Sequence, residues 1–335
     1  MVYIYVKSAG GRKYYYLRLS QRIRGKLVVK DIAYLGNDVS KVKKNLDKIE
    51  QKYKDEIRKS YKTLKKFIDS NIYLEKIKKL KIKDSPYLER EMLEQVEAIK
   101  LHFNKYFLKL DKKTIENAYK NFLVDFAYNT TSIEGNTITL KEANKLLRED
   151  LTPKERTPRE IFDLQNTQKV FFEIINKNFD LNHEFIISIH DKLMKNIDPR
   201  AGYRTHDIRV FKSHFEASPA KYVKTDMDLL IKWYKENKEK LHPFVLAGMF
   251  HEKFEKIHPF ADGNGRTGRM LFVYMLLKEK FPPLIIQKKN RAEYLRVLGI
   301  ADKSSPLGTE VKHFKRLMEY LAQEYIENYW NSFNI

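Results

Sequence analysis

The chain has 335 residues, of which 42% are hydrophobic, so it can bury at least one sizeable core and is not a disordered polypeptide. It contains no cysteine, which excludes disulfides, thiolate metal sites and cysteine nucleophiles. Its 65 Lys and Arg residues against 44 Asp and Glu give a formal net charge of +21, which favours anionic partners. Because the basic residues are spread along the whole chain, the same excess is also typical of a solvated, lysine-rich surface.

The sequence offers no segment for a membrane. No apolar run reaches the length of a transmembrane helix, and the first residues lead into charged ones without the apolar centre of a signal peptide. We therefore expect a cytoplasmic protein without a membrane partner.

Residues 1–38 have the pattern of a small β module. Short runs of β-branched and aromatic residues, at 3–6, 14–19 and 27–36, are separated by a glycine pair and a basic turn. This pattern predicts a three-stranded meander.

The module also carries three consecutive tyrosines among basic residues, a composition found in proteins that bind single-stranded nucleic acid. Tyrosines equally pack ordinary small sheets, and the pattern favours that interpretation. Docking of a target is the expected role, with nucleic acid as an open alternative.

Residues 39–86 are rich in Lys and Glu, with Leu, Ile and Tyr at helical intervals interrupted near residues 70–71. They predict a helical spacer or a helical hairpin, which Pro86 ends. Residues 87–335 are predominantly helical by periodicity. One stretch, 202–223, instead alternates apolar and polar residues and predicts a β-hairpin or extended flap between helices. The fold class is therefore mainly α.

The chemistry is expected in the loop 258–269, His-Pro-Phe-Ala-Asp-Gly-Asn-Gly-Arg-Thr-Gly-Arg. A buried-helix pattern over 244–256 precedes it, and Pro259 disfavours helical geometry at His258, so the helix should end there. Gly263, Asn264 and Gly265 permit inward-pointing N–H groups, and the next helix should begin at about Asn264 or Gly265.

A glycine-rich turn that opens a helix favours phosphate, because unpaired N–H groups and the helix dipole both attract anions. Arg266 and Arg269 are three residues apart on the first turn, so both can reach one anion. Asp262 suits a Mg²⁺ ion that bridges two phosphates. His258 could take a proton from an attacking hydroxyl group. These parts together indicate phosphoryl or nucleotidyl transfer.

In this order the residues resemble the Fic-domain signature His-x-Phe-x-Asp-Gly-Asn-Gly-Arg-x-x-Arg at every position. The resemblance covers roughly residues 87–321 and implies a Fic-type helical bundle with a β-hairpin flap. It also implies a protein adenylyltransferase that moves AMP from ATP to a Ser, Thr or Tyr hydroxyl. A lysine after the motif asparagine marks the kinase-like branch of the family, whereas this chain has Gly265.

The resemblance further assigns the roles of the site residues. It makes His258 the general base, Asp262 the Mg²⁺ ligand and Phe260 a core anchor. The α- and β-phosphates would lie on Gly263, Asn264 and Gly265, and the outer phosphates would be held by Arg266 and Arg269.

A second motif, Thr130-x-x-x-Glu134-Gly135, lies in an expected helix over 120–135. By composition it is a helix end at Gly135, with Thr137 or Thr139 capping the next helix. It also resembles the Fic inhibitory motif, in which the glutamate pairs with the second motif arginine. This implies that Glu134 binds Arg269 and keeps basal activity low. Some relatives with this glutamate also remove AMP, so the reverse reaction stays open.

The family's flap pairs with an extended segment of the target protein, which implies docking at Val210, Phe211 and Lys212. Relatives with an inhibitory glutamate often pair, so a homodimer is open. A zinc-protease motif is excluded, because Glu255 stands where a second histidine would follow His251. The alternative function is a nucleic-acid-binding regulator in which the Fic core senses a nucleotide.

Overall fold

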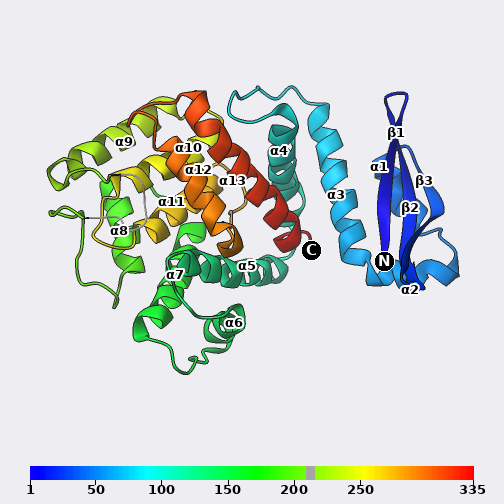
Figure 1. Cartoon of the computed structure of the whole chain (residues 1–335), viewed down its shortest axis with the longest axis horizontal. Coiled ribbons are helices and arrows are strands. Elements are labelled where there is room, and N and C mark those ends of the chain that lie inside the picture. The colour runs from blue at the N-terminus through cyan, green and yellow to red at the C-terminus, as the bar shows by residue number, and fades with distance from the viewer. Residues whose placement is uncertain (209–215) are drawn as a thin grey trace.

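The computed structural model describes residues 1–208 and 216–335 (Figure 1). Over these ranges it contains thirteen α-helices and one three-stranded sheet. The prediction of a mainly α protein with a small N-terminal meander is confirmed. In the described part of the chain, no helix combines the length and apolarity needed to cross a membrane.

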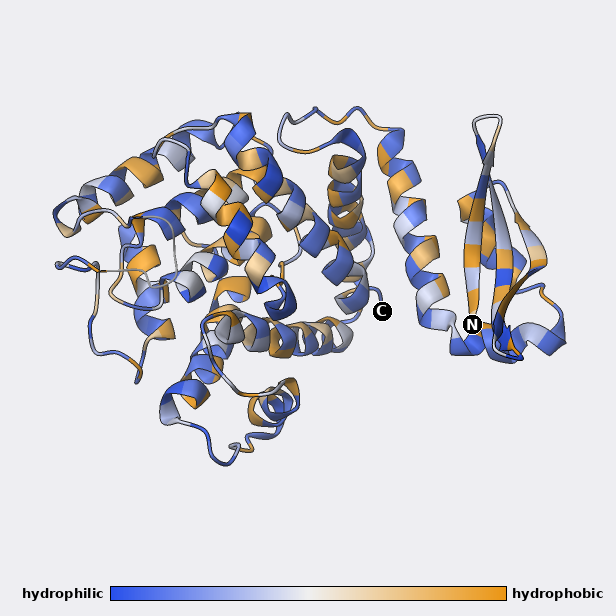
Figure 2. Ribbon diagram, viewed as in Figure 1, coloured by the Kyte–Doolittle hydropathy of each residue, from blue (hydrophilic) through white to orange (hydrophobic). Residues whose placement is uncertain are grey.

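The N-terminal sheet is antiparallel in the order β1-β2-β3, with β1 at Val2–Ala9, β2 at Arg12–Ile23 and β3 at Lys26–Gly36. Three helices follow: α1 (Val39–Leu46), α2 (Lys54–Lys59) and α3 (Tyr61–Lys78). Hydrophobic and hydrophilic residues alternate along the strands (Figure 2), so the sheet has one apolar face. That face and helices α1 and α3 form one hydrophobic cluster, to which the buried residues Val2, Ile4, Leu17, Leu35, Val42 and Leu64 belong. The strands and the expected spacer therefore share one core.

The larger unit contains the remaining ten helices. Their bounds are α4 (Arg90–Lys105), α5 (Lys112–Ile133), α6 (Leu140–Glu149), α7 (Pro158–Asn176), α8 (His183–Leu193), α9 (Val223–Asn237), α10 (Pro243–Ile257), α11 (Asn264–Lys278), α12 (Arg291–Ala301) and α13 (Val311–Ser332). Helix α3 lies beside α4 and joins the two units (Figure 1). Lys66 of α3 also donates a hydrogen bond of 2.9 Å to Asn331 of α13.

Helices α10 and α11 form the centre of the larger unit. They pack on each other, and nearly every residue of both is buried. Such all-round burial is typical of a helix enclosed by others. The loop between them is therefore fixed at both ends by a buried helix.

Local sequence explains where the helices around this centre begin. Thr139 and Thr157 each cap a helix through a reciprocal capping box, with Glu142 and Glu160 respectively. The cap at Thr139 confirms one of the two positions expected from sequence.

The expected flap is only partly described. Its flanks, 202–208 and 216–219, carry no strand, and a short 3-10 turn follows at Ala220–Tyr222. Val210, Phe211 and Lys212 lie outside the described residues. The hairpin and its docking role therefore stay predictions.

Candidate active site

The loop 258–263 joins the central helices as the sequence predicts. Helix α10 ends at Ile257, and His258 caps it in the left-handed conformation, with φ 53° and ψ 60°. Gly263 is also left-handed, with φ 78°, and α11 begins at Asn264. A non-glycine residue at positive φ is uncommon, and such residues cluster at functional sites.

Asn264 holds the loop closed. Its side-chain oxygen accepts from the Phe260 N–H at 2.8 Å, and its side-chain nitrogen donates to the Phe260 carbonyl at 2.8 Å. The buried Phe260 ring stacks on His190 of α8, with ring centroids 3.7 Å apart. Phe260 is thus a core anchor, as predicted. The Asn264 side chain is committed to the loop, so this residue can offer an anion only its backbone N–H.

His258 has the geometry of a general base. Its Nδ1 lies 3.0 Å from the Glu255 carbonyl oxygen, which can only accept, so the ring proton is on Nδ1. In the neutral ring the basic atom is then Nε2. Burial lowers the pKa of His258, and this outweighs the Glu255 carbonyl and the Glu134 carboxylate, which both raise it. The imidazole is therefore neutral at neutral pH.

Asp262 lies between two arginines. Its carboxylate pairs with Arg159 of α7, lies 3.4 Å from Arg266 Nη2 and accepts from the Gly263 N–H at 2.6 Å. Burial would raise the pKa of Asp262, but Arg266 and Arg159 hold it below its usual value. The carboxylate is ionised and one-third exposed, so a cation can reach it.

Arg266 is less accessible to a phosphate group than the sequence suggests. It is 3% exposed and forms a buried ion pair with Asp163 of α7. The sequence analysis missed Arg159 and Asp163, which lie about 100 residues before the loop. The only signal for Asp163 is a carboxylate on the apolar side of a predicted helix, between Phe162 and Leu164.

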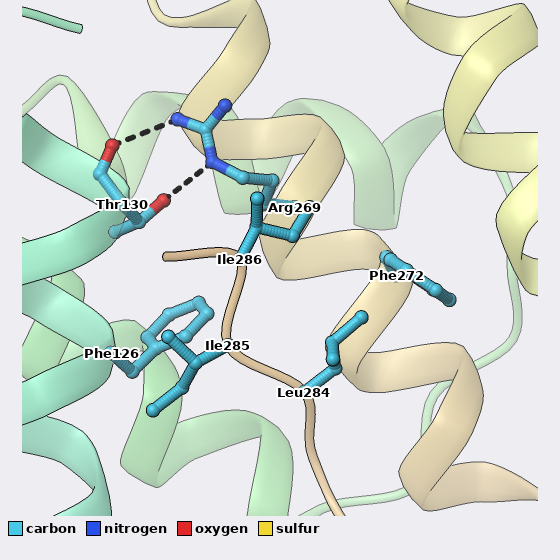
Figure 3. Close-up of a pocket in the computed structure, with 7 residues that line it drawn as sticks. All are labelled: Phe126, Thr130, Arg269, Phe272, Leu284, Ile285 and Ile286. Carbon is cyan, nitrogen blue, oxygen red and sulfur yellow. Dashed lines mark hydrogen bonds between the residues drawn. The ribbon is translucent and has the colours of Figure 1, made fainter. Parts of the chain in front are cut away.

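Arg269 is bound to the upstream motif. It donates to Glu134 Oε1 at 2.7 Å, to the Thr130 carbonyl at 2.9 Å and to the Thr130 hydroxyl at 2.8 Å. Figure 3 shows the two bonds to Thr130 beside a cavity of about 10 Å³, room for one water molecule. The Arg269 side chain is 4% exposed, whereas the Glu134 side chain is 41% exposed.

The charge of Glu134 is stabilised by this pairing. Burial alone would raise its pKa, but attraction to Arg269, a hydrogen bond from the same group and the nearby Arg266 lower it. Gly135 follows at φ 105°, the left-handed turn expected at the end of α5. The structure thus contains the contact between Glu134 and Arg269 that the resemblance implies, while its inhibitory role stays a prediction.

A residue that the sequence analysis missed connects the flap to the loop. The backbone N–H of Arg204 donates to the Pro259 carbonyl at 2.9 Å, and its Nε donates to the His258 carbonyl at 2.8 Å. Its Nη2 donates to the Ser218 carbonyl on the other flank of the flap. Arg204 is 5% exposed, so a single buried guanidinium ties both flanks to the histidine.

A cavity of about 210 Å³ lies next to the end of α10. Ile257, Lys256 and the flap flank from Glu216 to Pro219 are among its walls. None of the loop residues 258–269 is among its walls, and it is smaller than the roughly 300–1,000 Å³ usual for drug-sized ligands, so it does not mark a nucleotide site.

The residues also fit a magnesium ion that arrives with a nucleotide. Among the residues that the structure describes, no group of three or more His, Asp or Glu side chains could hold a metal alone. Mg²⁺ commonly takes one or two carboxylates and completes its shell with phosphates and water. The single carboxylate of Asp262, beside the start of α11, meets that requirement.

Fold and loop together define a helical protein in which a histidine-bearing loop leads into the N-terminus of a buried helix. The Fic/DOC family model matches residues 180–276, which include the whole loop. This segment of the chain is therefore similar to Fic/DOC domains.

Curated proteins with similar sequences carry the Fic name. "Protein adenylyltransferase Fic" of Culex quinquefasciatus is 27% identical over 247 residues, which cover 67% of this chain and 47% of the relative. "Protein adenylyltransferase fic-1" of Caenorhabditis elegans is 26% identical over 246 residues, which cover 71% of this chain and 47% of the relative. The chain thus spans about half the length of these relatives.

Solved structures share the fold. A Fic domain containing signaling protein from Bacteroides thetaiotaomicron superposes with a TM-score of 0.63 at 22% identity, covering 71% of this chain and 94% of that one. A fragment of C. elegans Fic-1 superposes with a TM-score of 0.59 at 25% identity, and the match covers 72% of this chain and 71% of that fragment.

Proposed function

We propose that this protein transfers AMP from ATP to a Ser, Thr or Tyr hydroxyl of a target protein. The observation that carries the proposal is the position of His258, a neutral imidazole held beside the N-terminus of α11. The names of the curated relatives support the same reaction.

The reaction balances with the residues present. Nε2 of His258 takes the proton of the target hydroxyl, whose oxygen attacks the α-phosphorus of ATP. A bond forms between that oxygen and the α-phosphorus, the bond to the bridging oxygen of the β-phosphate breaks, and pyrophosphate leaves. His258 then releases its proton to water.

The phosphates would bind at the first turn of α11. The N–H groups of Asn264 and Gly265 lie at the start of that helix and would bind the α- and β-phosphates, and that of Gly263 would join them once it leaves Asp262. Arg266 and Arg269 would hold the outer phosphates once they leave their present carboxylate partners. Asp262 would hold Mg²⁺, which supplies charge neutralisation on the phosphates when bound.

Gly265 supports AMP transfer over phosphate transfer. A Cβ atom at this position would lie 2.1 Å from Glu134 Oε1, so the lysine of the kinase-like branch would require the Glu134 carboxylate to shift. AMP transfer needs the nucleotide to bind with its α-phosphorus facing His258.

We further propose that Glu134 inhibits this activity. It occupies Arg269, and a charge-assisted bond at 2.7 Å competes directly with a phosphate for the same guanidinium. The ionised, partly exposed carboxylate can also accept a hydrogen bond from water, which supports AMP removal as a second activity of the same site.

Other aspects of the proposal rest on the family alone. They are docking of an extended target segment at Val210, Phe211 and Lys212 and pairing into a homodimer. A cytoplasmic location is proposed from the sequence instead, whose lack of cysteine suits a reducing compartment. A Fic core that only senses nucleotide would have no use for an oriented base, which disfavours the regulator alternative.

The test compares ATP labelled at the α-phosphorus with ATP labelled at the γ-phosphorus. We expect the Glu134→Gly variant to label itself and lysate proteins from the first nucleotide only, and Glu239→Gly, at an exposed turn, to behave as the wild type. Label from the γ-phosphorus would show a kinase instead. Equal labelling by the wild type, Glu134→Gly and His258→Ala would refute the assigned roles.

A further inference from the structure

The two faces of the N-terminal sheet differ in chemistry. Alternate residues of each strand, among them Val2, Ile4, Tyr15, Leu17 and Leu35, are buried against α1 and α3. The residues between them point the other way. They include five tyrosines, which we call the tyrosine face: Tyr3, Tyr5, Tyr14, Tyr16 and Tyr34.

The strand register brings these rings together. Tyr5 pairs with Tyr16 across β1 and β2, and Tyr16 pairs with Tyr34 across β2 and β3. The ring centroids of Tyr16 and Tyr34 are 5.2 Å apart, and those of Tyr14 and Tyr34 are 6.5 Å apart. The rings of Tyr14, Tyr16 and Tyr34 thus form an aromatic cluster over β2 and β3, and the register places Tyr5 of β1 opposite Tyr16.

Core packing does not account for these rings. None of the five belongs to a hydrophobic cluster of the described chain, and Tyr34 is 54% exposed. The interpretation favoured from sequence, that the tyrosines pack the sheet, holds for Tyr15, which is 2% exposed. Ring contacts between strands stabilise a sheet modestly, but they do not require five tyrosines on its open face.

A guanidinium lies within the tyrosine face. The Arg18 guanidinium carbon is 3.3 Å from the centroid of the Tyr5 ring, and Arg18 also bonds the Tyr3 side chain and Asp31. Arginine stacked on an aromatic ring presents its remaining N–H groups at the same surface.

The surroundings of the face are strongly basic. Residues 1–38 contain eight Lys and Arg against two Asp. Four of the basic residues lie on the exposed β2–β3 hairpin, and no carboxylate of the described chain is within ion-pair distance of them: Arg22, Arg24, Lys26 and Lys30.

The hairpin turn has an arginine at a position whose left-handed backbone conformation favours other residues. Arg24 has φ 50° and Gly25 has φ 79°, so both central residues of the two-residue turn are left-handed. Gly, Asn and Asp are the residues such a turn favours. A cation at this tip is therefore not explained by the turn itself.

We infer that the tyrosine face binds single-stranded nucleic acid. Unpaired bases would stack on the rings of Tyr16 and Tyr34, and the phosphates would contact Arg18 and the basic hairpin. A duplex hides the faces of its bases, so stacking selects single strands. An acidic peptide would match the charge but has no use for the aromatic surface.

The tyrosine face is separate from the proposed active site. The sheet lies at the opposite end of the molecule from α8, whose His190 contacts the catalytic loop (Figure 1). Binding here would bring the adenylyltransferase to nucleic acid without occupying its active site, so the proposal stands whether or not AMP transfer occurs.

Fluorescence anisotropy of the full chain with labelled oligothymidylate and oligouridylate tests the inference. We expect Tyr16→Ala/Tyr34→Ala to bind about 5- to 150-fold more weakly, the range for losing one stacked base. Tyr16→Phe/Tyr34→Phe should retain the affinity, because it keeps the rings. Tyr61→Ala, an equally exposed tyrosine at the start of α3, is the matched control and should bind as the wild type.

A salt titration provides a readout that does not depend on the sheet packing. Arg24→Gln/Lys26→Gln changes only exposed side chains at the turn. It should reduce the slope of log affinity against log salt by about 1.4, if each side chain contacts one phosphate. Stronger binding of DNA than RNA, or the reverse, would identify the natural strand.

Three results would overturn the inference: no binding of either oligonucleotide, equal binding of a duplex, or equal losses for the alanine pair and Tyr61→Ala. Labelled polyglutamate that binds as well as the oligonucleotides, with the same loss in the alanine pair, would assign the face to acidic protein segments instead.

Discussion

Glu134 Oε1 lies only 2.1 Å from the point where a Cβ atom on Gly265 would be, so the carboxylate rests directly on the first turn of α11. The two residues are 131 positions apart, yet each restricts the other. A side chain at 265 requires Glu134 to move, and Glu134 covers the backbone that we propose binds phosphate.

This contact predicts that Gly265→Ala and Glu134→Gly are coupled in stability. In the wild type, alanine at 265 should displace the carboxylate and weaken its bond to Arg269. In the Glu134→Gly background, most of that cost should disappear, because of the three atoms nearest the new Cβ atom only Arg269 Nη1, at 2.9 Å, would remain. We expect a coupling free energy of about 0.5–3 kcal/mol in a double-mutant cycle measured by urea unfolding. Additive effects of the two substitutions would show that the contact is not formed in solution.

The environment of His258 predicts the pH dependence of transfer. The reaction needs the neutral imidazole, and burial lowers the pKa of His258 from its ordinary value of 6.5. Activity should therefore persist below that pH and fall only as His258 becomes protonated. Since Glu134 raises the pKa of His258, its removal should shift the acidic limb further down. Profiles of kcat/KM for the wild type and Glu134→Gly would show the shift, and an upward movement would contradict the assignment.

Arg204 should act as a positioning residue. Arg204→Lys loses the fork that bonds the His258 and Ser218 carbonyls, so His258 should be less well placed and kcat should fall about tenfold or more with little change in KM for ATP. The positive charge of Arg204 also lowers the pKa of His258. Arg204→Gln removes that charge, so the pKa of His258 should rise, and NMR titration of the imidazole can measure the rise. Arg200→Lys, exposed and paired with Asp198, is the control. A rise in KM alone would place Arg204 in substrate binding instead.

Arg159 should compete with magnesium for Asp262. Its guanidinium pairs with the carboxylate that we propose holds the ion, and its side chain is 54% exposed. Arg159→Ala in the Glu134→Gly background should lower the Mg²⁺ concentration needed for half-maximal labelling by about 3- to 10-fold. This range corresponds to a competing ion pair that contributes roughly 0.7–1.4 kcal/mol. Asp262→Asn should raise it. An unchanged magnesium requirement in both variants would remove Asp262 from the proposed metal site.

Much of this site could be predicted because its residues are close in sequence. The proline after His258 and the glycine before Asn264 fix the two helix ends by local backbone rules, and the structure has both ends where expected. The three-stranded meander likewise follows from alternation and turn residues alone.

The partners of the loop could not be predicted in the same way. Asp163, Arg159 and Arg204 reach the loop only through the packing of α7 and the flap flanks, and no local pattern records such contacts. The pairing of Glu134 with Arg269 was expected only because a family motif names it. On the sheet, a run of tyrosines does not reveal which rings face the core, since that depends on register.

Mass spectrometry of the protein after incubation with ATP and Mg²⁺ tests the central claim most directly. We predict that Glu134→Gly gains AMP on a hydroxyl side chain, that the wild type gains little, and that Glu134→Gly/His258→Ala gains none. AMP on the double variant to the same extent as on Glu134→Gly, or no AMP on any of the three proteins or on added lysate proteins, would contradict the account.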